Sequence, residues 1–417
     1  MPGLLCSKRI SYRFYSSYSS YSSYISYRLY RFYSSYNSYN SYTHFTMQQS
    51  FKRIESLDIL RGLDLFLLVF FQPVLMQICA RADAPWVKTI GRWFSHADWE
   101  GLHLWDMVMP LFLFMAGASM PFAFSKYRTA ESKLPIYRKI LKRFVILFIL
   151  GMVVQGNLLG LDPQMFRFYS NTLQAIASGY LIASVLMLHL SLRAQIVATC
   201  LLMLIYWLPM HFCGDYTAEG NFAEMVDKAV LGRWRDGVYW DEQGQWHFSP
   251  WYHYTWVWSS LTFGVTVMLG TFAGQVIKAG SGNRQFTALR LAVIAFALLV
   301  LGYLHSMHAP VNKHLWTTSM TLISGGWCWA LMAFFYWLVD VKGWSRGLSW
   351  LKIYGTNSIV AYMLGEVVNF RSVVQSVSYG LQPYLQDWYN VWLAFGNYLI
   401  IFFILRAMYK ARVFVKI

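Results

Sequence analysis

Ten apolar runs, each long enough to cross a bilayer, constrain this chain more than any other feature of its sequence. A membrane-spanning helix needs ~20 mostly apolar residues, because lipid offers no partner to an unpaired backbone group. The runs fall near residues 57–79, 104–124, 140–160, 172–190, 195–210, 255–277, 287–305, 315–339, 353–369 and 390–409. Only 13% of the residues are charged. We therefore predict an all-α, polytopic membrane protein with about ten transmembrane helices, formed by residues 47–417.

The first 46 residues differ from the rest in composition. Residues 11–42 are a tract of tyrosine and serine that contains no acidic residue. The tract has neither the continuous apolar segment nor the small-residue cleavage site of a signal peptide. Its composition favours disorder over a packed domain. We expect residues 1–46 to be either a disordered leader or a mis-called start, with translation beginning at Met47.

The basic residues predict how the spans are oriented, because Lys and Arg collect in cytoplasmic loops. If the N-terminus is inside, 21 of the 30 Lys and Arg residues after Met47 lie in inside segments and 9 in outside segments. This bias explains the net charge of +16. We therefore expect membrane lipid around the protein and no nucleic acid as a partner. Both termini are then inside. A large outer loop, residues 211–254, is rich in aromatic residues, which suit either sugar stacking or anchoring at the headgroups.

A histidine and three carboxylates stand at the outer mouth of the second apolar run, as His96, Asp98, Glu100 and Asp106. Titratable groups are costly at membrane depth, so such a cluster indicates function by default. A carboxylate that holds a histidine in one tautomer and supports its protonated form is a general-base arrangement. The spacing of His96 and Asp106 is weak evidence by itself, and we interpret Asp98 and Glu100 as residues at the rim.

The first span carries charges on a single stripe. Asp58, Arg61 and Asp64 follow at intervals of three residues, which puts Arg61 within reach of both carboxylates. We interpret the set as a structural ion pair that locks this helix to a neighbour. A contact with a cytoplasmic anionic ligand is the alternative.

Several motifs occur in a fixed order along the chain. They are Ser56-Leu57-Asp58-x-x-Arg61-Gly62, His96-x-x-Trp99-x-Gly101-Leu102, Asp106-x-x-x-Pro110-x-Phe112-x-Phe114-x-x-Gly117, Asn171-Thr172-Leu173-Gln174, Pro310-Val311-Asn312-Lys313-His314-Leu315-Trp316 and Gly355-x-Asn357-Ser358-Ile359. In this order the motifs resemble those of the heparan-α-glucosaminide N-acetyltransferase family and its bacterial relatives.

The resemblance implies an enzyme that moves an acetyl group from cytoplasmic acetyl-CoA to an amino sugar or glycan outside the membrane. His96 matches the family's catalytic histidine and Asp106 its acidic partner. His96 would take a proton from the acceptor or carry the acetyl group itself. Lys313 is a candidate for orienting substrate or stabilising an oxyanion. Among the neighbouring motif residues, Trp99, Asn312 and His314 are candidate substrate contacts.

The chain departs from the family at Gln72, which stands where animal members have asparagine at the outer end of the first span. This change leaves the acceptor open, as it does the choice between N- and O-acetylation. The chain has no metal-ligand spacing such as HExxH, so we expect no metal. The resemblance also implies a possible homodimer in the cytoplasmic (inner) membrane of a bacterium.

Two other functions are compatible with the sequence. A transporter or export component for a sugar or glycolipid, without covalent chemistry, would use polar residues inside the spans to line a path. Such residues are Gln155, Asn157, Glu366 and Asn369. An inactive scaffold is the other alternative, although the histidine, aspartate and lysine of the motifs are all present.

Overall fold

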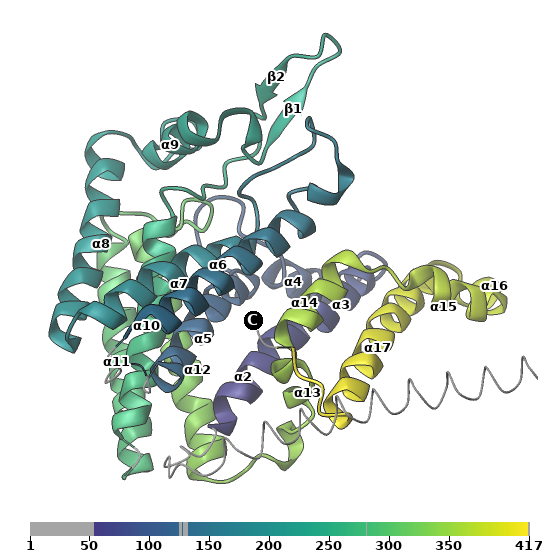
Figure 1. Cartoon of the computed structure of the whole chain (residues 1–417). Coiled ribbons are helices and arrows are strands. Elements are labelled where there is room, and N and C mark those ends of the chain that lie inside the picture. The colour runs from purple at the N-terminus through teal and green to yellow at the C-terminus, as the bar shows by residue number, and fades with distance from the viewer. Residues whose placement is uncertain (1–53, 125–126, 128–131, 281, 416–417) are drawn as a thin grey trace, which may run out of the picture. The chain divides into compact units, whose positions relative to one another are not determined.

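The computed structural model describes residues 54–124, 127, 132–280 and 282–415. The Tyr/Ser leader and Met47 lie outside these residues, so the prediction made for them stays a prediction. Over the described residues the chain is mainly helical, and its two short strands form one hairpin (Figure 1). This architecture confirms the all-α, polytopic class.

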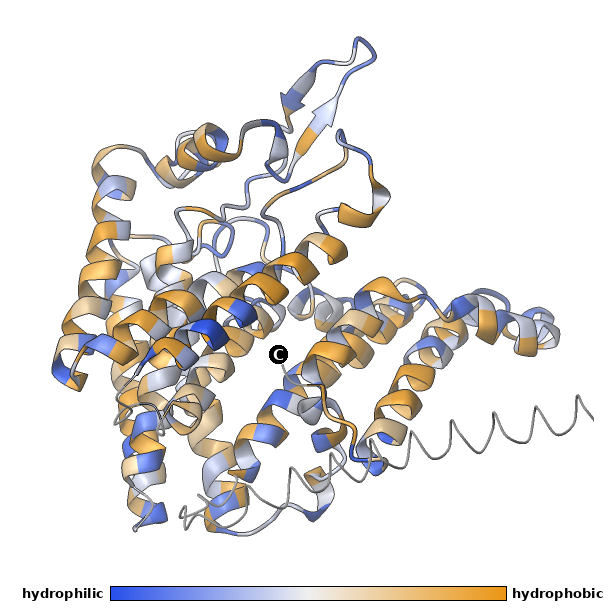
Figure 2. Cartoon of the chain, in the orientation of Figure 1, coloured by the Kyte–Doolittle hydropathy of each residue, from blue (hydrophilic) through white to orange (hydrophobic). Residues whose placement is uncertain are grey.

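Eight helical segments among the described residues are long and apolar enough to cross a membrane. They are α2–α3 (α2 Glu55–Phe66, a π-helical turn Leu67–Phe71 and α3 Gln72–Cys79), α5 (Val108–Ala123, extended back to Leu104), α7 (Thr172–His189), α8 (Leu192–Phe212), α10 (Ser260–Ala279), α11 (Arg284–His305), α12 (Thr318–Phe335, extended to Val341) and α17 (Tyr389–Lys410) with the short helices before it. Figure 2 shows hydrophobic residues predominating along the long helices.

The other two predicted spans are also helical, but each departs from the expected form. Helix α6 (Leu134–Val154) begins before the predicted residue 140 and carries four basic residues in its first half. The run at 353–369 is split into α13 (Leu351–Thr356) and α14 (Ser358–Val367). Asn357 breaks it, because its side chain donates to Val413 O (3.0 Å) and accepts from Val415 N (3.0 Å). A count of ten membrane crossings therefore stays a prediction.

Helices α5 and α10 cross in backbone contact. A Cβ atom placed on Gly117 would lie 1.9 Å from Val267 O, and one on Gly270 would lie 1.9 Å from Phe114 O. Small residues permit such close packing in membranes, where van der Waals contact replaces the hydrophobic driving force. The crossing fixes α5, whose N-terminal end directly follows Asp106.

The predicted outer loop spans residues 213–259 in the structure, between α8 and α10, and we call it the α8–α10 loop. It contains α9 (Phe222–Leu231) and an antiparallel pair of strands, β1 (Val238–Trp240) and β2 (Trp246–Phe248), which the sequence had not indicated. The loop lies on the same face of the helices as His96, since Trp99 Nε1 donates to Tyr216 O (3.0 Å). The segments that carry the site motifs therefore meet at one face.

Candidate active site

Two loops that are distant in the sequence meet at the candidate site. One follows α4 (Pro85–Trp93) and carries His96, and the other joins α11 to α12 and carries Lys313. Gly101 N donates to Val311 O (2.8 Å), which ties the two loops together. Gly101 has φ +113°, a left-handed conformation that favours glycine. This junction brings the motif that begins at His96 beside the motif that contains Lys313.

Asp106 is the anchor of the site and is fully buried. Its Oδ2 atom accepts from the backbone N–H groups of His103 (2.9 Å) and Ala97 (3.2 Å). Its Oδ1 atom lies 2.7 Å from His96 Nδ1. Two lone pairs would repel at that distance, so Nδ1 carries the proton and donates to the carboxylate. The Nε2 atom of His96 is then left as the basic nitrogen.

Lys313 completes the cluster from the other loop. Its Nζ atom lies 3.3 Å from Asp106 Oδ1, 2.9 Å from His96 Nδ1 and 3.4 Å from His96 Nε2. Burial lowers the pKa of Lys313 to about 8, against the opposing pull of the Asp106 carboxylate. The lysine and the aspartate are both buried, whereas 43% of the His96 side chain is exposed. The arrangement presents one accessible imidazole over a buried ion pair.

His314 follows Lys313 and lies between two aromatic rings. Tyr254 stacks on it with ring centroids 4.1 Å apart, and Trp99 lies 5.3 Å away. Burial lowers the pKa of His314 to about 4, so the ring is neutral at pH 7. Its Nδ1 atom has no hydrogen-bond partner in the described part of the chain. The structure thus brings Trp99 and His314 together beside the cluster.

Asn312 and Gln72 lie outside the cluster of His96, Asp106 and Lys313. Asn312 is buried, and its Oδ1 atom accepts from Leu315 N (3.0 Å), so its carboxamide shapes the turn that carries Lys313. Gln72 donates from Nε2 to Phe94 O (3.2 Å) and thereby supports the start of the His96 loop. For the residues that the structure describes, neither carboxamide forms a hydrogen bond to His96, Asp106 or Lys313.

The charged stripe of the first span lies in α2, whereas Gln72 begins α3. Arg61 Nη1 is 4.0 Å from Asp58 Oδ1. Asp64 is fully buried, and both of its oxygens lack a hydrogen-bond partner among the described residues. The structure therefore brings Arg61 to one carboxylate of the stripe and leaves the other apart.

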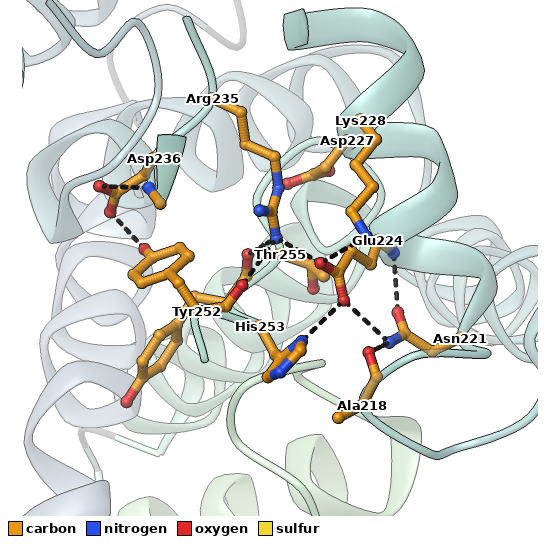
Figure 3. A network of polar contacts seen from close by, with 12 residues as sticks. Ala218, Asn221, Glu224, Asp227, Lys228, Arg235, Asp236, Tyr252, His253 and Thr255 are labelled. Atoms are coloured by element: carbon orange, nitrogen blue, oxygen red, sulfur yellow. Dashed lines mark hydrogen bonds and ion pairs between the residues drawn. The ribbon is translucent and has the colours of Figure 1, made fainter. Parts of the chain in front are cut away.

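Sequence reasoning missed an ionic network in the α8–α10 loop, which Figure 3 shows. Glu224 lies on α9 and contacts Arg235 and His253, which come from separate turns of the loop. Charged residues at these spacings match no motif, so no sequence signal singled them out. Within the described ranges, no group of three or more His, Cys, Asp or Glu side chains is arranged to hold a metal ion.

The chain is distantly similar to curated proteins that are named as N-acetyltransferases. Residues 53–163 match a family model described as a domain of unknown function, DUF5009. Heparan-alpha-glucosaminide N-acetyltransferase of Homo sapiens is 24% identical over 367 residues, which cover 76% of this chain and 53% of that protein. The Mus musculus protein of the same name is 23% identical over 372 residues, 78% of this chain and 55% of its own length. The chain thus spans about half the length of these curated relatives. The matches confirm the resemblance that the motifs indicated.

Proposed function

We propose that this chain is a membrane-embedded acetyltransferase that moves an acetyl group from acetyl-CoA to an amino sugar or glycan. The observation that carries the proposal is the contact of His96 with both Asp106 and Lys313. An accessible imidazole with one unprotonated nitrogen, a buried carboxylate partner and a nearby ammonium group are what acyl transfer requires. The distant similarity to heparan-alpha-glucosaminide N-acetyltransferases supports the same reaction class.

In the proposed reaction, the acceptor amine or hydroxyl attacks the thioester carbonyl carbon while His96 Nε2 takes its proton. The new C–N or C–O bond forms, the C–S bond breaks, and the imidazolium returns the proton to the departing thiolate. Asp106 stabilises the imidazolium through Nδ1–H. Lys313, in its protonated form, stabilises the oxyanion of the tetrahedral intermediate.

A second route uses the same atoms in two steps. His96 Nε2 attacks the thioester first, which expels CoA and leaves an acetyl-imidazole, and the acceptor then removes the acetyl group. The two routes differ in one observable. Only the second leaves labelled acetyl groups on the protein when no acceptor is present.

The proposal includes a direction across the membrane. The excess of Lys and Arg in the predicted inside segments supports an orientation with both termini in the cytoplasm. Acetyl-CoA would then enter from the cytoplasm, and His96 would act at the opposite surface. The cytoplasmic membrane of a bacterium and a homodimeric assembly belong to the same proposal.

The test is acetyl transfer by purified protein in liposomes, with labelled acetyl-CoA and a panel of amino sugars and glycans. We expect transfer by the wild type and a loss of about 10²- to 10⁴-fold in His96→Ala. His247→Ala is the matched control, because His247 is exposed and pairs with Asp241 in the β-hairpin. Equal transfer by wild type and His96→Ala would reject His96 as the base.

A polar bridge between the end of α6, the start of α7 and a tyrosine within α14 favours a second candidate, a transporter. Asn171 Nδ2 donates to Gln155 Oε1 (2.9 Å) and to the Tyr362 hydroxyl (3.0 Å), which links α6, α7 and α14. The same liposomes decide between the two functions. Uptake or release of an unmodified sugar, without acetyl transfer, would support transport and contradict the enzyme.

A further inference from the structure

The α8–α10 loop contains a buried ionic network that the proposed reaction does not use. Glu224 and Arg235 are at most 2% exposed, and the Arg235 Nη2 atom lies 3.1 Å from Glu224 Oε1. The same carboxylate contacts Lys228 Nζ (3.1 Å) and His253 Nδ1 (3.1 Å), as Figure 3 shows. Burying an ion pair costs desolvation free energy that the pairing barely recovers. Such a network is therefore better explained by the geometry it imposes than by stability.

The network fixes the backbone of residues 252–257, which we call the bridging segment. Arg235 Nη2 donates to Tyr252 O (3.3 Å) and Tyr254 O (3.3 Å) as well as to Glu224. Asp227, one turn after Glu224 on α9, accepts from Trp256 N (2.7 Å) and Val257 N (2.9 Å). Two buried charged side chains thus hold the bridging segment at both ends.

The bridging segment in turn holds the loop that carries Lys313. Thr255 donates to His314 O from its backbone N–H (3.0 Å) and its hydroxyl (3.2 Å). The Tyr254 ring stacks on the His314 ring. Since His314 directly follows Lys313, these contacts fix the backbone from which the lysine side chain reaches Asp106.

We propose that Arg235 and Glu224 are positioning residues that hold Lys313 Nζ against Asp106 and His96 through the bridging segment and His314. The inference concerns the geometry of the lysine, and only its consequence for acetyl transfer rests on the proposed function. A displacement of ~1 Å at such a group can cost about 10²-fold in rate. Arg235 and Glu224 therefore control the site without touching a reacting atom.

The test reads the environment of the Lys313 amine directly. Competitive labelling of purified protein with acetic anhydride over a pH series, read by peptide mass spectrometry, gives the titration midpoint and accessibility of Lys313. The titratable side chains around that amine are Asp106, His96 and His314, with Tyr254 stacked on the last. In the wild type we expect slow labelling with a midpoint near the pKa of about 8 that burial produces.

In the structure the Arg235 Nη2 atom alone contacts Glu224 Oε1, Tyr252 O and Tyr254 O. Arg235→Lys keeps the positive charge but shortens the side chain, so the ammonium group falls short of the position that Nη2 occupies. We expect faster labelling of Lys313 and a midpoint that moves toward the ordinary lysine value of ~10.4. Glu224→Gln keeps the shape and removes the charge, and we expect a smaller shift in the same direction. It serves as the second variant if Arg235→Lys does not fold.

Asp241→Asn is the matched control, because Asp241 lies in the same loop but pairs with His247 at the surface. An unchanged midpoint and labelling rate in a folded Arg235→Lys or Glu224→Gln protein would overturn the inference. A shifted midpoint in these variants, combined with a wild-type protein that transfers no acetyl group, would support the inference and reject only the proposed function.

Discussion

Replacing Asp106 by asparagine tests the role assigned to the buried carboxylate without changing its size. The introduced carboxamide can offer its one oxygen either to the Ala97 and His103 N–H groups or to His96, but not to both. If the oxygen keeps the two backbone bonds, the amide N–H₂ faces His96 Nδ1. Nδ1 must then accept, the proton moves to Nε2, and the imidazole loses its basic nitrogen.

The expected loss in kcat is about 10³- to 10⁴-fold, or ~4–5.5 kcal/mol of barrier. The effect on stability is smaller. Lys313 has a pKa of about 8 in the folded protein, against ~10.4 in an unfolded chain. Loss of the Asp106 charge can lower the folded-state pKa of Lys313 further. At pH 7 this fall reduces stability only until the lysine is neutral in the folded protein. This limits the additional cost from Lys313 to ~1.4 kcal/mol, since one pKa unit equals 1.36 kcal/mol.

The assay is acetyl transfer at saturating acetyl-CoA, measured together with thermal unfolding of the same preparation. Asp98→Asn is the matched control, because Asp98 is exposed and lies two residues from His96. We expect Asp98→Asn to keep near-normal transfer. A folded Asp106→Asn protein with wild-type kcat would refute the assignment of His96 as a base oriented by Asp106.

Three further predictions concern the lysine and the helix crossing. Transfer should fall as pH rises through about 8, where Lys313 loses its proton, and Lys313→Gln should be slow and lack this alkaline decline. The folded-state pKa of Lys313 is below the unfolded value, so the unfolded chain binds more protons between about pH 8 and 10.4. The stability of the folded protein should therefore rise with pH across that window. Equal slopes of unfolding temperature against pH for wild type and Lys313→Gln would contradict this. Gly270→Val should lower the unfolding temperature strongly or prevent folding, because its Cβ would lie 1.9 Å from Phe114 O, whereas Gly347→Val, with nothing within 4 Å, should be tolerated. Similar unfolding temperatures for the two valine variants would show that α5 and α10 do not cross as described.

The sequence by itself determined the class of the fold. Apolar runs of membrane length became helices because a chain in lipid must satisfy its own backbone groups. Eight of the predicted spans are helices long and apolar enough to cross a membrane among the described residues. The contact of His96 with Asp106 was also within reach of the sequence, since both belong to one short loop before α5.

The tertiary structure decided the features that depend on contacts between residues far apart in the chain, or on which of several partners a side chain contacts. Asn357 splits a predicted span because its carboxamide bonds to the C-terminal segment, which no local pattern contains. Arg61 lies 4.0 Å from Asp58, whereas the Asp64 oxygens have no hydrogen-bond partner among the described residues, a difference that the equal spacing did not predict.

The site shows the same division. The order of the motifs indicated the pairing of His96 with Asp106, although the spacing of the two residues is weak evidence by itself. Only the folded protein brings Lys313 to this pair from 217 residues beyond His96 and buries it there, and only the fold supplies the Arg235 contacts behind it. The physical reason is that burial and long-range contact set the charge and reach of these groups, and neither is encoded in the local sequence.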